Sequence, residues 1–276
     1  MPSFPFLRLP ILIQLLILKN SSLLDLFYLS LISKHSKQIV KSLNITLAKL
    51  EWGFDNTSKF FNLRLTPSNG SQLYICTKTY PEVPVGSINF NDKVLSVFHA
   101  EYDCQNRLAV QNELSDNDRL ELMDQLTKHF SDLFKVTEYH LHSSDRPDFL
   151  ACFVWKYTRK LANLRLTNQR SIPLTSDEMK FVLDELIVTD KLFLLSFVED
   201  GFEYAGQLKM KKLHVRKADW LELEAILNME CEYLRIYRSP FTYKDINTIV
   251  KKWLDLGSNG LRNLMDFKIQ GKIISQ

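Results

Sequence analysis

The first forty or so residues are mostly apolar, and polar residues divide them into short apolar segments. The run from Leu9 to Leu18 contains one polar side chain, Gln14, and stops at Lys19-Asn20. Pro10 suits the first turn of a helix, where its missing N–H costs nothing. A second apolar stretch follows Ser22, with Asp25 three residues on, which is the pattern of an N-terminal capping box.

A third helix is expected to begin at Ser33 or Ser36 and to place Ile39, Val40 and Leu43 on one face. Short helices in a segment of about forty residues cannot bury this many Leu and Ile side chains among themselves. The surplus apolar surface must therefore meet another domain or a partner protein.

The opening segment also invites interpretation as a transmembrane helix or as a signal peptide. A transmembrane helix needs about 20 nearly uninterrupted apolar residues, and the run Leu9–Leu18 is too short. A signal peptide fits better, because that run has the length of an apolar core and Arg8 precedes it. No small-x-small cleavage site follows. Four N-x-S/T sequons agree with export: Asn20, Asn44, Asn56 and Asn69.

Between Ile45 and about Val110 the pattern becomes that of short strands separated by turn residues, and we expect several antiparallel strands there. From Ser115 onward, strand patterns alternate with helix patterns. Helix starts are expected at Ser115, Thr175 and Thr242, each with an acidic residue three positions on. Such connections favour parallel strands with right-handed crossovers.

Three further elements are expected in the second half: helices over Asp145–Tyr157 and from Thr175 to Ile187, and a last strand over Leu261–Ile269. Several strands share a motif at intervals of about 20 to 30 residues, which is similar to leucine-rich repeats. The motif occurs as Asn163-Leu164-Arg165-Leu166, Lys212-Leu213-His214-Val215 and Tyr233-Leu234-Arg235-Ile236.

Composition and motifs argue against an enzyme. The 276 residues are 24% charged with a net charge of +3, which is too weak to indicate nucleic-acid binding. No phosphate-binding loop, nucleophile elbow or zinc-protease motif occurs. His140-Leu141-His142 is a weak metal signal, and we expect exposed or capping histidines. We predict no metal, no cofactor and no membrane contact.

The four cysteines contain no CxxC pair and do not form a disulfide framework in a chain of this length. We expect buried free thiols in a reducing compartment. Their positions are Cys76, Cys104, Cys152 and Cys231.

The opening residues also form an ordered series of motifs. They are Phe6-Leu7-Arg8-Leu9-Pro10, then Ile13 and Leu16, then Leu26-Phe27-Tyr28-Leu29-Ser30, then Ser33-Lys34, then Ile39-Val40-Lys41-Ser42-Leu43. This series resembles the F-box. One departure is the run Ile11–Leu18, which lacks the Glu common after Leu-Pro and is more apolar than usual.

The F-box resemblance implies a three-helix module that docks on a Skp-type adaptor and, through it, on a cullin–RING ubiquitin ligase. The sequence does not divide the aliphatic residues between that interface and an internal core. The residues expected at the adaptor are Leu9, Pro10, Ile13, Leu16, Leu26, Leu29, Ser30, Ser33 and Lys34.

A second series of motifs covers residues 218–264. It includes Asp219-Trp220, Leu227 to Cys231, the Thr242-x-x-Asp245-Ile246-Asn247 helix start, Trp253 and Gly257-Ser258-Asn259. This series resembles the F-box-associated domain, type 2. Gly260 stands where the family usually has Pro, and relatives tend to continue beyond Ile269, so we expect an incomplete last repeat.

Together the two resemblances imply a non-enzymatic substrate adaptor of a ubiquitin ligase, acting in the cytoplasm or nucleus on an unknown target protein. The expected class is α+β multidomain: an F-box over 4–44, a segment of short antiparallel strands over 45–114, and an F-box-associated α/β domain over 115–276. A secreted glycoprotein and a hydrolase of unrecognised type are the alternatives.

Overall fold

The computed structural model describes residues 6–55, 58–77, 84, 86–91, 93–99, 106–110, 114–144, 148–167, 172–255 and 266–271. The chain forms two compact units. The first comprises residues 1–53 and 59–138, and the second comprises 54–58 and 139–276. Packing therefore places the helix that begins after Ser115 with the N-terminal helices and the β-rich segment. The expected boundary at residues 114/115 lies inside the first unit.

The first unit opens with a 3₁₀ turn, η1 (Phe6–Arg8), followed by α1 (Ile11–Lys19), α2 (Leu23–Ile32) and α3 (Lys34–Ser42). The predicted capping box at the start of α2 is confirmed, because Ser22 Oγ accepts a hydrogen bond from Asp25 N–H and the Asp25 carboxylate accepts one from Ser22 N–H. Ser33 caps α3 by accepting from the N–H of Ser36 at 3.0 Å. Local side-chain chemistry thus sets where α2 and α3 begin.

In the described part of the first unit, six strands follow in the order β1-β2-β3-β6-β5-β4. The pairs β2–β3, β4–β5 and β5–β6 are antiparallel, as predicted, whereas β3 and β6 are parallel. The parallel pair arises because the β4–β5 hairpin intervenes in the chain before β6 returns beside β3. The bounds are β1 (Thr46–Asp55), β2 (Phe60–Pro67), β3 (Leu73–Cys76), β4 (Gly86–Phe90), β5 (Lys93–His99) and β6 (Asn106–Val110).

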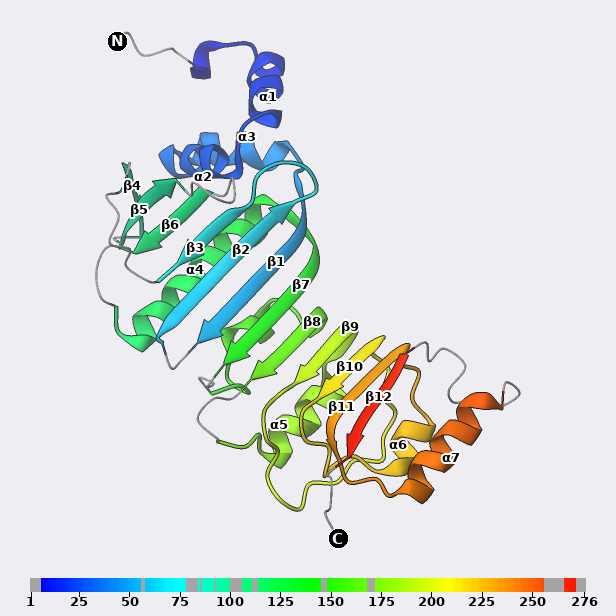
Figure 1. Cartoon of the computed structure of the whole chain (residues 1–276). Coiled ribbons are helices and arrows are strands. Elements are labelled where there is room, and N and C mark those ends of the chain that lie inside the picture. Colours follow the sequence, from blue (N-terminus) through cyan, green and yellow to red (C-terminus); the bar gives the residue numbers. More distant parts are fainter. Residues whose placement is uncertain are drawn as a thin grey trace. The chain divides into compact units, whose positions relative to one another are not determined.

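Helix α4 (Asp116–Leu133) lies across one face of these strands (Figure 1). It begins at the predicted cap, where Ser115 Oγ accepts from Asp118 N–H. Trp52 of β1 is fully buried and donates its indole N–H to Thr127 Oγ1 of α4 at 2.9 Å. Burying a Trp with its one polar atom satisfied fixes the helix on the sheet.

The second unit contains six strands in chain order, β7-β8-β9-β10-β11-β12. Every adjacent pair is parallel, which confirms the predicted parallel strands; the handedness of the crossovers stays a prediction. Neither the register nor the pairing tests the likeness to leucine-rich repeats, which stays a prediction. The bounds are β7 (Lys135–Ser144), β8 (Lys160–Thr167), β9 (Ile187–Leu194), β10 (Lys212–Val215), β11 (Tyr233–Ser239) and β12 (Asp266–Gly271).

A ladder of leucines runs across this sheet in register: Leu141, Leu164, Leu192, Leu213 and Leu234. These side chains are buried. The helical elements of the unit are η2 (Phe153–Lys156), α5 (Ser176–Lys180), the π-helical turn η3 (Phe181–Glu185), α6 (Leu223–Leu227) and α7 (Tyr243–Leu254). The capping boxes predicted at Thr175 and Thr242 are both present.

Two predicted helices differ from the structure. In the described part of the helix expected over Asp145–Tyr157, residues 148–157, the helical element is the four-residue turn η2. Aromatic packing holds this segment instead, because the Trp155 indole donates to the carbonyl of Phe149 and the two rings lie 5.2 Å apart. The helix expected to reach Ile187 ends in η3, and Ile187 begins β9. The last strand starts at Asp266, while Leu261 and Gly257 lie outside the described residues.

Within the described ranges, no helix combines the length and the apolar character needed to cross a membrane.

Candidate partner-binding site

Helix α1 exposes nearly all of its apolar side chains. Leu12 is 76% exposed and Leu16 is 64% exposed, while only Gln14 and Leu18 are buried. A contiguous apolar surface of this kind on a short helix marks an interaction site. We call it the α1 apolar face, and it consists of Ile11, Leu12, Ile13, Leu16 and Ile17.

Side-chain hydrogen bonds complete the C-terminal end of the helix that carries this face, whereas no side chain caps its N-terminus. Gln14 Nε2 donates to the carbonyl oxygen of Leu9, before the helix begins, at 2.7 Å. At its end, Asn20 Nδ2 donates to the carbonyl of Leu16 at 2.9 Å, and Ser21 Oγ donates to that of Ile17 at 3.2 Å. Helix ends need such partners when no further turn supplies them. The α1 backbone is thus hydrogen-bonded without burying the apolar side chains.

Helix α2 is almost as apolar as α1 but turns its large side chains inward. Leu26 is 1% exposed and Phe27 is 0% exposed. The Phe27 ring lies 4.9 Å from that of Phe130 in α4 and 5.8 Å from that of Phe90 in β4. Aromatic pairs at these separations add stabilisation beyond area burial, so α2 is part of the core of the first unit.

Polar contacts anchor the same helices on α4. Ser30 Oγ lies 2.8 Å from His129 Nε2, and Lys37 and Lys41 of α3 form ion pairs with Asp132 at 2.8 and 2.6 Å. Burial, with a smaller contribution from Lys37, lowers the pKa of His129 to about 4. Hydrogen bonds from Lys37 and Lys41 lower the pKa of Asp132 to about 2. We call Ser30, His129, Lys37, Lys41 and Asp132 the α4 anchor.

The structure divides the residues expected at the adaptor into groups. Leu9 and Leu29 are partly buried, and Leu26 and Ser30 are buried. Leu26 and Ser30 are therefore removed from the expected surface, since their side chains are already used by the core and by the α4 anchor. The exposed members are Pro10, Ile13, Leu16, Ser33 and Lys34.

The sequence did not single out Leu12, Ile17 or Ile11, which are exposed members of the same face, nor Ile32 at the end of α2, which is 69% exposed. Residues 11–18 are apolar apart from Gln14, so no 3.6-residue periodicity separates an inner from an outer face. The departure at Ile11–Leu18 was the signal that could have directed attention to these positions.

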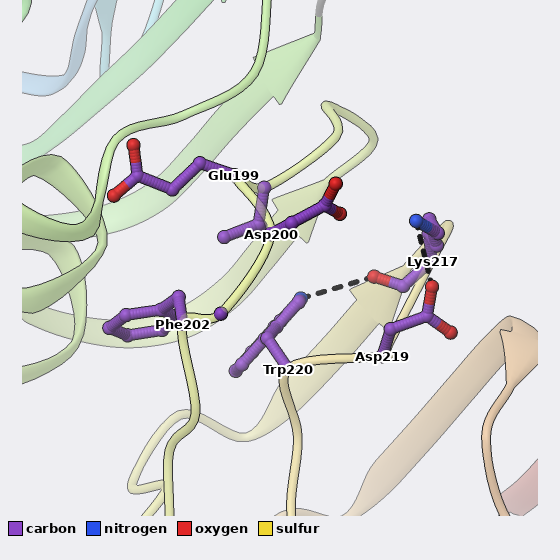
Figure 2. A pocket seen from close by; sticks show the side chains of 8 residues that line it. Glu199, Asp200, Phe202, Lys217, Asp219 and Trp220 are labelled. Atoms are coloured by element: carbon purple, nitrogen blue, oxygen red, sulfur yellow. Dashed lines mark hydrogen bonds and ion pairs between the residues drawn. The ribbon is translucent and has the colours of Figure 1, made fainter.

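The second unit has a small cavity between the loops that follow β9 and β10, shown in Figure 2. It measures about 60 Å³ and is lined by Val198, Glu199, Asp200, Gly201, Phe202, Lys217, Asp219 and Trp220. Small-molecule sites usually measure roughly 300–1,000 Å³. The size of this cavity therefore fits no drug-sized ligand.

Much of the charge around this cavity is engaged by the chain itself. Lys217 Nζ lies 2.8 Å from Asp219, and this hydrogen bond raises the pKa of the lysine (Figure 2). Glu199 accepts from the N–H of Ser176 at 2.6 Å, which lowers the pKa of its carboxyl. The Trp220 indole donates to the Lys217 carbonyl at 3.1 Å. These contacts hold the loops together.

The described histidine and cysteine residues considered for metal or thiol chemistry pack within the fold. His140 is buried, and its Nδ1 lies 3.0 Å from Asn163 Nδ2, so the expectation of an exposed or capping side chain is wrong for this residue. Cys76 and Cys231 are buried and form no disulfide, as predicted, whereas Cys152 is only partly buried, so the expectation of burial is wrong for it. Burial raises the pKa of Cys231 to about 12. Cys104 lies outside the described residues. Across the part of the chain that the structure describes, no group of three or more His, Cys, Asp or Glu is placed to hold a metal.

The structure combines an N-terminal helical module that has an exposed apolar face with a C-terminal unit of parallel strands and helices. Comparison with protein families makes the class specific. Residues 6–47 match the F-box domain, and residues 206–269 match the F-box associated family, type 2. Both resemblances seen in the sequence are thereby confirmed for these segments. Searches of curated proteins and of solved structures found no match.

The family matches coincide with structural elements. The F-box match covers η1 through α3 and includes the whole apolar run of α1, which gives the signal-peptide interpretation no support. The second match covers β10 to β12 with α6 and α7. Several of its signature residues, Trp220, Met229 and Cys231, are buried. Those residues therefore shape the core of the second unit.

Proposed function

We propose that this protein is a substrate adaptor of a Skp–cullin–F-box ubiquitin ligase. In this proposal the α1 apolar face docks on a Skp-type adaptor, and the second unit binds a target protein for ubiquitin transfer. The chain itself performs no chemistry, because the catalytic cysteine would belong to other subunits. Ligases of this kind work in the cytoplasm or nucleus, and we place the protein there as part of the proposal.

The exposure of the α1 apolar face is the observation that supports the proposal most strongly. Five aliphatic side chains of one nine-residue helix are exposed, and they lie within the segment that matches the F-box domain. Water contact with this area is costly, at about 25 cal/mol per Å² of apolar surface. A partner that covers Leu12 and Leu16 would remove that cost, and Ser33 and Lys34 would supply part of a polar rim.

The α4 anchor gives the helices that follow α1 a firm support on the rest of the first unit. Helices α2 and α3 are tied to α4 through Ser30–His129 and the two ion pairs of Asp132. A binding surface gains precision when rigid elements support it. We therefore infer that α2 and α3 form one rigid piece with α4, and that α1 joins this piece through the chain at Ser22.

The test is co-purification of the full chain with a Skp-type adaptor and a cullin from co-expressing cells. We expect Leu12→Asp combined with Leu16→Asp to weaken adaptor binding by about a hundredfold, because two apolar anchors at the centre of an interface become charged. The matched control is Leu254→Asp, which changes a side chain of similar exposure, 67%, in the second unit.

Thermal unfolding of both variants should match the wild type, since none of the three leucines is buried. Undiminished adaptor binding by the double variant, or an equal loss in the Leu254→Asp control, would overturn the proposal.

A further inference from the structure

The outer side of the parallel sheet in the second unit carries basic and aromatic side chains in register. On β8 the buried Leu164 and Leu166 flank the exposed Arg165. Because side chains alternate between the two faces of a strand, Arg165 and its register partners lie on the face opposite the leucine ladder. One row across the sheet reads His142, Arg165, Phe193, His214, Arg235 and Lys268.

The neighbouring row adds further cations and another ring. Lys191, Lys212 and Tyr233 are in register on β9, β10 and β11. We call the combined surface the basic face, and it consists of His142, Arg165, Lys191, Phe193, Lys212, His214, Tyr233, Arg235 and Lys268.

Cations and rings touch one another across the basic face. The Arg165 guanidinium carbon lies 6.0 Å from the centre of the Phe193 ring, and Lys212 Nζ lies 5.0 Å from that of Tyr233. The rings of Phe193 and His214 are 4.4 Å apart. Stacking on a ring holds the stem of a long cationic side chain and leaves its donors directed at solvent.

The charge of this face is unbalanced. Five of its residues are Arg or Lys. Among the residues with described side chains, the acidic group paired with them is Asp190, which lies 3.9 Å from Lys191 Nζ and 4.0 Å from Lys212 Nζ. The whole chain has a net charge of only +3. Positive charge is thus concentrated here well beyond its share, which favours and steers an anionic partner.

We propose that the basic face binds an acidic segment, rich in Asp and Glu, of the target protein. This inference rests on the proposed function, and it names the chemistry of the target. From β7 to β12 the first row spans five strand spacings, or about 24 Å. An extended segment of about seven residues covers that distance. Carboxylates of the target pair with the arginines and lysines, and its apolar atoms pack on Phe193 and Tyr233.

An acidic polypeptide fits this surface better than a nucleic acid. Rings lie between several of the cations, and Asp190 lies among them, within 4.0 Å of two lysine amines. A continuous phosphate backbone would be repelled by that carboxylate, whereas a polypeptide can place a neutral or basic residue opposite it.

The experiment measures fluorescence anisotropy of a labelled peptide of alternating Glu and Ser, titrated with the purified full chain. We expect binding that weakens with salt. Arg165→Glu combined with Lys212→Glu should weaken it by about tenfold or more, because two attractive pairs become repulsive. The matched control, Lys180→Glu with Lys251→Glu, makes the same change of net charge on α5 and α7 and should alter affinity by less than about twofold.

A milder pair, Arg165→Gln with Lys212→Gln, keeps the test valid should the charge-reversed protein fail to fold, and it should weaken binding by about threefold. Absence of peptide binding by the wild type, equal weakening in the helix control, or tighter binding to labelled polyuridine than to the peptide would overturn the inference.

The same variants are assayed for co-purification with the Skp-type adaptor, which separates this inference from the proposed function. We expect Arg165→Glu with Lys212→Glu to retain the adaptor fully. If the wild type does not bind the adaptor but binds the peptide selectively, the ligase proposal is refuted and the basic face remains a docking surface. If the wild type binds the adaptor but not the peptide, only the inference about the basic face is refuted.

Discussion

Helices α1 and α2 have similar apolar sequences and opposite environments. In α1, Leu12 and Leu16 are mostly exposed, whereas in α2, Leu26 and Phe27 are buried against α4 and its aromatic neighbours. The two helices are nine and ten residues long and follow one another directly in the chain. The comparison teaches that apolar composition alone does not place a side chain in a core. What differs is that α2 has a packing partner within the chain.

The same comparison separates stability from binding. Removing an apolar group from α2 leaves a cavity in the core and lowers the free energy of unfolding. Removing one from α1 takes away surface that is already in water. A substitution in α2 is therefore expected to destabilise the protein far more than one in α1.

Phe27→Ala should lower the free energy of unfolding by about 4 kcal/mol, because a fully buried aromatic side chain is lost together with its ring contacts. Leu12→Ala, in contrast, should change that free energy by less than about 0.5 kcal/mol. Urea denaturation of the full chain, followed by circular dichroism, measures both. Equal destabilisation by the two variants would mean that the environments of α1 and α2 do not differ as described.

His129 should make the stability of the first unit depend on pH. Its pKa lies at about 4 in the folded protein against an ordinary value of 6.5. Between these values the unfolded chain binds a proton that the folded chain does not, so stability falls as pH falls from 6.5 towards 4. After allowance for partial solvent exposure, we expect a loss of about 2 kcal/mol over this range.

The His129→Gln variant tests this assignment, since an amide can keep a hydrogen bond to Ser30 but does not titrate. Urea midpoints measured at intervals from pH 7 to pH 4 should fall less steeply in the variant than in the wild type. Parallel curves would show that His129 is not the group responsible. The pKa of Asp132, at about 2, keeps its own contribution in place until the pH falls below the ordinary value of 3.8.

Local signals in the sequence predicted many of the elements. The caps at Ser22, Ser115, Thr175 and Thr242 all have the expected hydrogen bonds, because a capping interaction depends on residues only three positions apart. The parallel order of β7 to β12 followed from alternating helix and strand patterns. The parallel pairing of β3 with β6 did not, since it depends on a long-range return of the chain.

The α1 apolar face and the basic face were harder to predict from the sequence. Residues 11–18 are apolar nearly throughout, so only packing against α4 could show that α2, and not α1, enters the core. The basic face was not predicted, because the motif Asn163-Leu164-Arg165-Leu166 was interpreted only as similar to a leucine-rich repeat. Which rings and cations meet across the sheet required the register of neighbouring strands.

Hydrogen–deuterium exchange of the full chain, alone and with a Skp-type adaptor, tests the central claim most directly. We predict new protection in α1, where the apolar face becomes covered, and little change in α2, whose amides and side chains are already packed. Protection confined to the second unit, or an unchanged α1 in the presence of a bound adaptor, would contradict the account.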